Sequence, residues 1–221
     1  LKRSFLRDRL VRDPVIIDAG SCIVLDGMHR VAALRELKCV RVPVCAVDYS
    51  NPSVRVGVWY RTLSGRLFPD QFEKVLSSSE VTFERISVDM TKLLDDPPLA
   101  LLLSTGECFR LESDSMNAYE VLKKAERCAR DLGLAVAFET EHDALEQLAT
   151  KQKDAVIILP KIDKMSVRNA GLTGRPLPPK VTRHVIPARP LGVNVPIAVL
   201  TNAGTALQDA NSSFLKGLQE R

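Results

Sequence analysis

The sequence predicts a mixed fold of helices and strands, of the α+β or α/β class, from three features of its 221 residues. Short runs of β-branched residues, such as residues 15–17, are typical of strands. Apolar residues three and four positions apart, as in residues 117–131, are typical of amphipathic helices. Segments of the two kinds alternate along most of the chain, which indicates sheets packed against helices.

The composition is that of an ordinary globular protein. Hydrophobic residues make up 45% and charged residues 26% of the chain, so we expect neither disorder nor a strongly charged surface. The net charge of +4, from 31 basic and 27 acidic residues, suits a small phosphorylated ligand and does not require nucleic acid. No apolar run reaches the length of a membrane span, and there is no signal-peptide pattern. We therefore expect neither a membrane nor a nucleic acid as a partner.

The cysteines and histidines argue against a zinc site. The five cysteines have no C-x-x-C spacing, and none of the three histidines pairs with a cysteine at ligand spacing. Most of the cysteines lie in apolar surroundings, which is typical of core thiols in a reduced compartment. The sequence thus predicts a cytoplasmic protein and assigns no metal ligand.

The first half of the chain predicts a small domain of residues 1–66. The expected elements are, in order, the end of a helix at 1–9, strands at 15–17 and 23–25 joined by a turn at 18–21, a helix from 28, a strand at 42–47 and a strand at 54–60. Pro43 has no backbone N–H, so its strand is expected to lie at a sheet edge or to begin there. Residues 61–69, which contain Gly65 and Pro69, are expected to form a linker.

The second half predicts another α/β domain, of residues 67–221. The expected elements are a helix at 70–76, a strand at 81–86, a hairpin with strands at 99–103 and 108–111, a helix at 117–131, a strand at 134–138, a helix at 143–151 and a strand at 155–159. The last of these strands is apolar throughout, which is typical of complete burial. Residues 178–187 contain three prolines and are expected to form a stiff, extended loop.

A candidate anion site lies in residues 23–34, with the sequence IVLDGMHRVAAL. The pattern predicts a strand, a tight turn and a helix, with Asp26 near the helix N-cap and Gly27 allowing close approach of a ligand. The unpaired N–H groups of a first helical turn attract phosphate, and His29 and Arg30 add side-chain donors there. Junctions of this kind are common, so the local pattern alone is equally compatible with a purely structural turn.

A second candidate site is the proline-rich loop, with the sequence PPKVTRHVIP. Lys180, Thr182, Arg183 and His184 place several hydrogen-bond donors in a short, rigid segment that could receive a phosphate or a carboxylate. The alternative is a tether between domains whose charges face water, and an isolated loop of this composition favours that alternative.

Together the two segments resemble the free serine kinases of the ParB/sulfiredoxin superfamily. The first segment carries the pattern D-G-x-H-R and the second the pattern P-K-x-T-R-H-V-x-P, and the order of elements between them is similar over roughly residues 10–200. The Asp48-Tyr49 turn and the Val58-Trp59-Tyr60 strand match as well. The resemblance implies a ParB/sulfiredoxin-like N-terminal domain packed on a second small α/β domain, with a cleft between them.

The resemblance implies an enzyme that phosphorylates free L-serine to O-phospho-L-serine, with ADP or ATP as donor and Mg²⁺ as cofactor, and so supplies cysteine biosynthesis. The implied site residues are Asp26 for catalysis, Gly27, Met28, His29 and Arg30 for the nucleotide phosphates, and Thr182, Arg183 and His184 for the serine and phosphate side.

This chain departs from the family pattern in two places. The family often has His where this chain has Met28, so one phosphate contact is lacking. The catalytic Glu of the family belongs to an N-terminal H-E segment, which the resemblance places before residue 1. The sequence therefore assigns no general base, and it predicts neither the choice between ADP and ATP nor the oligomeric state.

Two other functions within the superfamily are alternatives to the kinase. A ParB-like, nucleotide-dependent DNA-binding regulator would need a DNA-reading element, but no helix-turn-helix pattern follows the first domain and the basic excess is modest. A sulfiredoxin-like reductase would need a nucleophilic Cys beside His29, but Met28 occupies that position and cannot form a thiolate.

Overall fold

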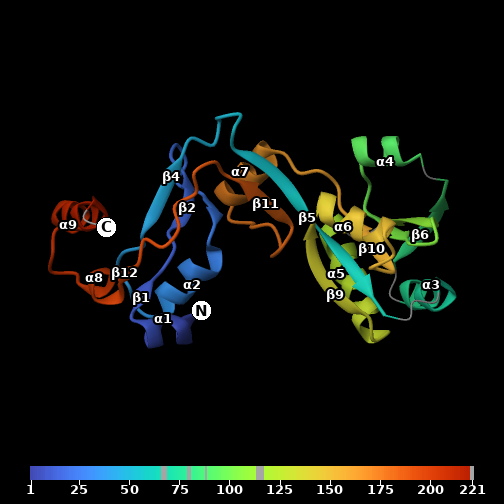
Figure 1. Cartoon of the computed structure of the whole chain (residues 1–221), viewed down its shortest axis with the longest axis horizontal. Coiled ribbons are helices and arrows are strands. Elements are labelled where there is room, and N and C mark those ends of the chain that lie inside the picture. Colours follow the sequence, from blue (N-terminus) through green and yellow to red (C-terminus); the bar gives the residue numbers. More distant parts are fainter. Residues whose placement is uncertain (66–68, 79–80, 88, 113–116, 220–221) are drawn as a thin grey trace. The chain divides into compact units, whose positions relative to one another are not determined.

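The computed structural model describes residues 1–65, 69–78, 81–87, 89–112 and 117–219. By contacts between residues the chain divides into two compact units (Figure 1). The first unit comprises Leu1–Arg55, Lys164–Pro176 and His184–Arg221, and the second comprises Val56–Asp163 and Leu177–Arg183. Both contain helices and strands, so the expected α+β class is confirmed.

The division into units differs from the boundary expected at residue 66. The chain enters the second unit at Val56, and two later segments return to the first unit. The first unit is therefore built from three separate parts of the sequence. A boundary inferred from local composition cannot show such a return, because the contacts that define it join residues far apart in the chain.

The first unit contains a three-stranded sheet with the order β3-β2-β4. Its strands are β2 (Val15–Asp18), β3 (Val24–Asp26) and β4 (Val44–Val47). Strand β2 pairs with β3 in antiparallel fashion, which confirms the expected hairpin, and with β4 in parallel fashion. Because β4 begins directly after Pro43 and lies at the sheet edge, the interpretation of that proline is also confirmed.

The rest of the first unit comes from both ends of the chain. Its helices are α1 (Lys2–Asp8), α2 (Met28–Glu36), α7 (Lys164–Leu172), α8 (Ile197–Thr201) and α9 (Leu207–Gln219), and β1 (Leu10–Val11) pairs with β12 (Val195–Pro196). One buried cluster contains Phe5 and Leu34 from the N-terminal part and Val193 and Leu200 from the C-terminal part. The C-terminal segment thus completes a core that the N-terminal segment begins.

The second unit is built on a larger sheet with the strand order β11-β5-β10-β7-β8-β6, and β9 also pairs with β5. The strands are β5 (Arg55–Ser64), β6 (Thr82–Ile86), β7 (Ala100–Leu103), β8 (Cys108–Glu112), β9 (Ala135–Thr140), β10 (Ala155–Ile158) and β11 (Thr182–Val185). The helices are α3 (Pro69–Ser78), α4 (Met90–Asp95), α5 (Ala118–Asp131) and α6 (Glu141–Ala149).

The strongest sequence patterns of the second unit are confirmed. Every residue of β10 is buried, as expected for a strand that is apolar throughout, and β7 and β8 form the expected antiparallel hairpin. Asn117 caps α5 by accepting hydrogen bonds from the backbone N–H groups of Tyr119 and Glu120, both at 3.1 Å. Gly133 follows the helix with a φ of 76°, which is the left-handed conformation that ends many helices.

The expected linker at residues 61–69 is wrong over its first part. Residues 61–64 continue β5, where Thr62 and Leu63 are fully buried. Arg61 is 2% exposed, and its Nε donates to Glu126 Oε1 of α5 at 2.6 Å. The expectation rested on Gly65 and Pro69, and the partner of Arg61, 65 residues away, is not visible from the local sequence. Residues 66–68 lie outside the described part of the chain.

The expected loop at residues 178–187 also needs correction, because β11 runs through its centre. The N–H of Trp59 donates to the carbonyl of Val181 at 3.2 Å, which joins this segment to β5. The helices α4, α7, α8 and α9 and the short strands β1 and β12 were not expected.

The cysteines agree only in part with the expected core thiols. All five are free, Cys108 and Cys128 are buried, and Cys22 is exposed. In the residues that the structure describes, no helix is long and apolar enough to cross a membrane.

Candidate active site

The first candidate site is the junction between β3 and α2. Asp26 is the last residue of β3, and Gly27 is the N-cap of α2 with a φ of 99°, a conformation that favours glycine. No side chain caps the helix, and its first intrahelical bond runs from the N–H of Val31 to the carbonyl of Gly27 at 3.0 Å. The N–H groups of the first turn therefore have no partner within the helix and are free to bind an anion.

Arg30 lies directly against this turn. A Cβ atom at Gly27 would come within 2.8 Å of Arg30 Nη2, so any other residue there would displace the Arg30 guanidinium, and the positive φ separately favours glycine. Arg30 Nη2 donates to Asp26 Oδ2 at 2.7 Å, whereas the buried Nε has no hydrogen-bond partner in the described part of the chain. An unpaired buried donor at a helix N-terminus is suited to an anionic ligand.

Asp26 is held between two guanidinium groups. Its Oδ2 accepts hydrogen bonds from Arg30 and from Arg189, which belongs to the C-terminal part of the chain. Burial disfavours the charged form of Asp26, but the charge of Arg189 and the hydrogen bond and charge of Arg30 outweigh it, so the pKa of Asp26 is below its usual value. Asp26 is therefore a carboxylate at neutral pH. It does not cap α2, although it lies next to the N-cap as expected.

His184 lies in the same unit and contacts Tyr49. The Nε2 atom is 2.9 Å from the Tyr49 hydroxyl, and the two ring centroids are 5.5 Å apart. Burial lowers the pKa of His184 to about 4, and the charges of Arg189 and Lys164 act in the same direction. The charge of Asp26 and a hydrogen bond to the backbone of Leu25 oppose this shift without cancelling it. His184 is therefore a neutral imidazole at pH 7.

A buried carboxylate supports Tyr49. Asp18 is 2% exposed and accepts hydrogen bonds from the Ser21 hydroxyl at 2.6 Å and from the backbone N–H of Tyr49 at 3.4 Å. Arg168 Nη2 also donates to Asp18, at 3.2 Å. The hydrogen bond from Ser21 is the largest cause that keeps the pKa of Asp18 below its usual value. The ionised Asp18 thus links the end of β2 to the residue that contacts His184.

The second unit holds Arg183. Its Nη2 donates to Glu141 Oε2 at 3.2 Å, and its guanidinium carbon is 6.0 Å from the centroid of the Trp59 ring. Glu141 is fixed in turn, because its Oε1 accepts a hydrogen bond from the backbone N–H of Val58 at 2.9 Å. The buried Nε of Arg183 has no partner within the described ranges. This arrangement leaves a positioned donor that can bind a carboxylate or a phosphate.

Trp59 is also close to a second cation. Lys180 Nζ is 4.9 Å from the centroid of its ring, and Lys180 has a φ of 60°. Tyr60, the next residue of β5, is buried, and its burial together with the charge of Glu141 raises its pKa to about 12. Tyr60 therefore stays protonated at neutral pH.

The predicted site residues fall into two groups. Asp26, Gly27, Met28, His29, Arg30 and His184 lie in the first unit, and Thr182 and Arg183 lie in the second. Arg183 and His184 are consecutive in β11, and consecutive strand residues point to opposite faces, so the two side chains have different partners. Met28 and His29 are exposed, whereas Thr182 is half-buried.

Sequence reasoning missed five residues of these clusters: Arg189, Glu141, Asp18, Arg168, and Tyr49 as the partner of His184. Arg189 stands between two prolines shortly after the second motif, and that position was a usable signal. Nothing in the local sequence marks Glu141, because it contacts Arg183 only through the pairing of distant segments.

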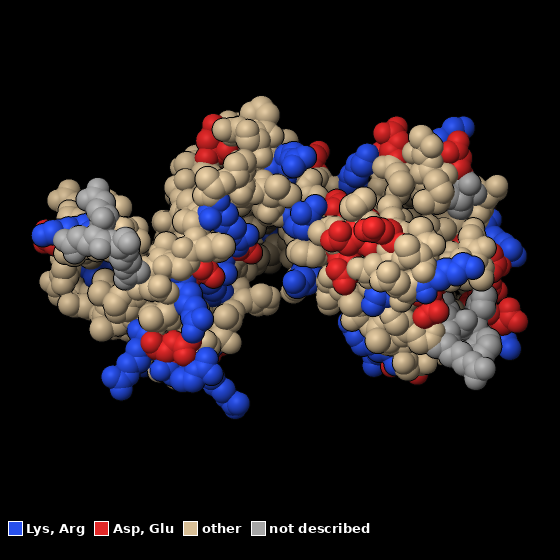
Figure 2. Space-filling model, viewed as in Figure 1, with Lys and Arg blue, Asp and Glu red and all other residues tan. Residues whose placement is uncertain are grey.

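The charges of the surface are mixed. On the face shown in Figure 2, Lys and Arg side chains are interspersed with Asp and Glu over both units. In the described residues, no group of three or more His, Cys, Asp and Glu side chains is placed to hold a metal ion. Mg²⁺ is commonly bound by one or two carboxylates together with substrate phosphates, so a nucleotide-borne Mg²⁺ does not require such a group.

The pH behaviour of His184 gives a direct test of its burial. We expect its ring signals in an NMR titration to change with a midpoint of about 4. Between pH 6.5 and 4 the unfolded chain binds a proton that the folded chain does not, so the free energy of unfolding decreases on acidification, by at most about 3 kcal/mol. A His184→Asn variant should lose that part of the pH dependence. A midpoint near 6.5 in the folded protein would contradict the buried environment.

Comparison with known proteins agrees with the resemblance seen in the motifs. No family model matches the chain. An ADP-dependent L-serine kinase from Thermococcus kodakarensis is 27% identical over 188 residues, which are 80% of this chain and 73% of the relative. An ATP-dependent L-serine kinase from Staphylothermus marinus is 25% identical over 186 residues, 79% of this chain and 71% of the relative. A ParB-like protein from Sulfolobus acidocaldarius is 24% identical over 176 residues, 78% of this chain and 73% of the relative.

The fold is similar to that of solved serine kinases. A mutant free serine kinase in complex with ADP superimposes with a TM-score of 0.75 and 23% sequence identity, covering 90% of this chain and 84% of that one. A free serine kinase in complex with AMP gives a TM-score of 0.74, also at 23% identity, and covers 90% and 83%. In its motifs, its sequence relatives and its fold, the chain resembles the free L-serine kinases over most of its length.

Proposed function

We propose that this chain is a phosphotransferase that converts free L-serine to O-phospho-L-serine with ADP or ATP as the phosphoryl donor. The observation that carries the proposal is the uncapped N-terminus of α2, where an unpaired Arg30 Nε and the ionised Asp26 meet. Two relatives that match 80% and 79% of this chain are named L-serine kinases, with ADP in one name and ATP in the other.

The nucleotide phosphates would bind at the start of α2. The free N–H groups after Gly27 and the guanidinium of Arg30 can bind phosphate oxygens, and exposed His29 can reach a ligand from the same turn. Arg189 adds a second guanidinium beside Asp26. Met28 contributes its backbone N–H, since its thioether is a weak acceptor.

Serine, and the phosphate group transferred to it, would bind to Thr182, Arg183 and His184. Arg183 is held by Glu141 and lies near the face of Trp59, so its charge is positioned before a ligand arrives. His184 is neutral and therefore acts through a hydrogen bond rather than through charge. A hydroxyl such as that of Thr182 can bind either a carboxylate or a phosphate oxygen.

Phosphoryl transfer depends mainly on positioning and on stabilising negative charge. The serine hydroxyl oxygen forms the new bond to phosphorus, the nucleotide leaves with the electrons of the broken P–O bond, and the hydroxyl proton must pass to a base. Asp26 can orient the hydroxyl or bind a metal. When bound, Mg²⁺ would neutralise charge on the phosphates. We further infer a cytoplasmic enzyme whose product serves cysteine biosynthesis.

A second candidate function is a ParB-like, nucleotide-dependent regulator that binds DNA, because one relative carries the name ParB-like protein. The interspersed acidic and basic side chains favour a small phosphorylated ligand over a DNA duplex (Figure 2). Salt-dependent retardation of duplex DNA in a gel, without turnover of serine, would favour the regulator instead.

The activity is tested by incubating the full-length protein with L-serine, Mg²⁺ and either ADP or ATP. We expect O-phospho-L-serine with at least one donor, detected by ³¹P NMR and mass spectrometry. Reactions without serine or with D-serine serve as controls, because they retain any hydrolysis of the nucleotide. Absence of product with both donors would refute the proposal.

The role of the β3–α2 turn is tested by Gly27→Ala. The new Cβ would contact the Arg30 guanidinium and strain a positive φ, so we expect nucleotide affinity to fall at least about tenfold. Gly106→Ala is the matched control, since Gly106 has a φ of 94° but no neighbour within 4 Å of an added Cβ. Calorimetric titration with ADP measures both. Equal affinities of the two variants would remove the turn from the nucleotide site.

The role of Arg183 is tested by Arg183→Ala in the same phosphorylation assay. Loss of a positioned guanidinium should raise the KM for serine at least about tenfold, because a charge-assisted hydrogen bond contributes about 1.5–3 kcal/mol. Arg85→Ala, in β6 of the same unit with a side chain that is 68% exposed, is the control. An unchanged dependence on serine concentration would exclude Arg183 from the serine site.

A further inference from the structure

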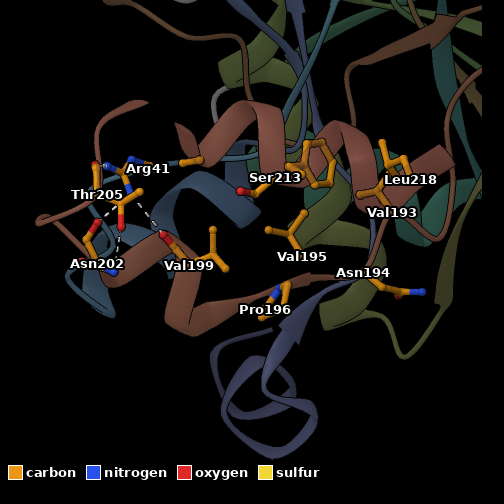
Figure 3. Close-up of a pocket in the computed structure, with 13 residues that line it drawn as sticks. Arg41, Val193, Asn194, Val195, Pro196, Val199, Asn202, Thr205, Ser213 and Leu218 are labelled. Carbon is orange, nitrogen blue, oxygen red and sulfur yellow. Dashed lines mark hydrogen bonds between the residues drawn. The ribbon is translucent and has the colours of Figure 1, made fainter. Parts of the chain in front are cut away.

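The first unit contains a pocket that none of the proposed site residues lines. It has a volume of about 350 Å³ and lies among β12, α8 and α9. Figure 3 shows Arg41, Asn202 and Thr205 at one end, and Val193 and Leu218 at the other. This volume is at the lower end of the range of pockets that enclose small organic molecules, about 300–1,000 Å³.

Most of the pocket wall is apolar. Val193 and Val195 are buried and belong to the core cluster of the first unit, and Phe214 and Leu218 of α9 pack against that cluster. The wall is therefore continuous with a folded core and does not depend on a loop. Such a wall stabilises an apolar ligand by removing it from water.

Arg41 gives the pocket a polar, positively charged end. Its Nη1 donates to the carbonyls of Asn202 at 2.6 Å and Val199 at 3.4 Å, and its Nη2 donates to the carbonyl of Thr205. These bonds fix the guanidinium at the end of α8, where free carbonyls favour a cation. A guanidinium has five N–H donors, so the N–H of Nε and one N–H of Nη2 remain available.

The charge of Arg41 is not neutralised by an acidic side chain in the part of the chain that the structure describes. Its described partners are all backbone carbonyls, and no Asp or Glu is among the described residues that line the pocket. A cationic ligand would be repelled there. The ammonium group of a free amino acid would likewise find no carboxylate partner, so a ligand with a single negative charge fits best.

We propose that this pocket binds a small monocarboxylate with an apolar body. The carboxylate accepts hydrogen bonds from the two free donors of Arg41, and the apolar body lies along Val195, Phe214 and Leu218. The proposal rests on the geometry of the first unit alone and does not depend on the kinase activity.

The probe is octanoate, titrated into the full-length protein by calorimetry and followed by NMR of backbone amides. We expect saturable binding with shifts confined to residues of β12, α8 and α9 and to Arg41. Octan-1-ol and octylamine have the same chain without the carboxylate and should bind at least about tenfold more weakly.

Two variants test the site from its two ends. Gly217→Leu fills the pocket, because Gly217 lines it and an added Cβ meets no atom within 4 Å, and leucine also favours the helix. It should abolish octanoate binding. Asn211→Leu, at an exposed position of α9 outside the lining, is the matched control and should bind like the wild type. Arg41→Gln should weaken octanoate binding at least about tenfold and leave octan-1-ol binding unchanged.

Three results would overturn the proposal. These are no saturable binding of octanoate to the folded wild type, equal affinity for octanoate and octan-1-ol, and undiminished binding to Gly217→Leu. Because Arg41 also holds the end of α8, thermal unfolding is recorded for each variant. If Arg41→Gln does not fold, the comparison of Gly217→Leu with Asn211→Leu decides the question.

Discussion

The first unit depends on the return of the C-terminal segment to the N-terminal one. Strand β12 pairs with β1 in antiparallel register, with Val195 opposite Val11, and both side chains are buried in one core with Leu34 of α2. Neither segment could bury this apolar surface alone, and the buried surface supplies most of the stability of a fold of this size. The same return brings His184 and Arg189 to the end of β3. The core and the candidate phosphate site therefore both depend on the same C-terminal segment.

Asp26 shows how this return changes the chemistry of a local motif. A carboxylate directly before a helix N-terminus would repel a phosphate if its charge were not balanced. Here it is balanced by Arg30 from its own helix and by Arg189 from the C-terminal segment. Two guanidinium groups around one carboxylate leave a net positive charge, and the first-turn N–H groups add to it. The motif and its distant partner together form a site suited to an anion.

Strand β11 supplies side chains to both units. Strand alternation sends Arg183 toward Glu141 and Trp59, whereas the next residue, His184, contacts Tyr49. A half-buried imidazole with a pKa of about 4 is kept neutral beside several cations, so it can serve as a hydrogen-bond partner without adding charge. A short strand thereby supplies two kinds of polar group to two separate environments.

The sequence by itself determined the elements whose signal is local. The strand–glycine–helix order around Gly27, the capped helix after Asn117 and the buried strand at residues 155–159 all follow from spacing and from backbone preferences. The tertiary structure alone decided which charges meet. Arg61 was expected in a linker with Gly65 and Pro69, whereas its partner Glu126 lies 65 residues away, and Arg189 reaches Asp26 across 163 residues. Periodicity describes one element at a time, whereas such pairs form only when distant segments share a core.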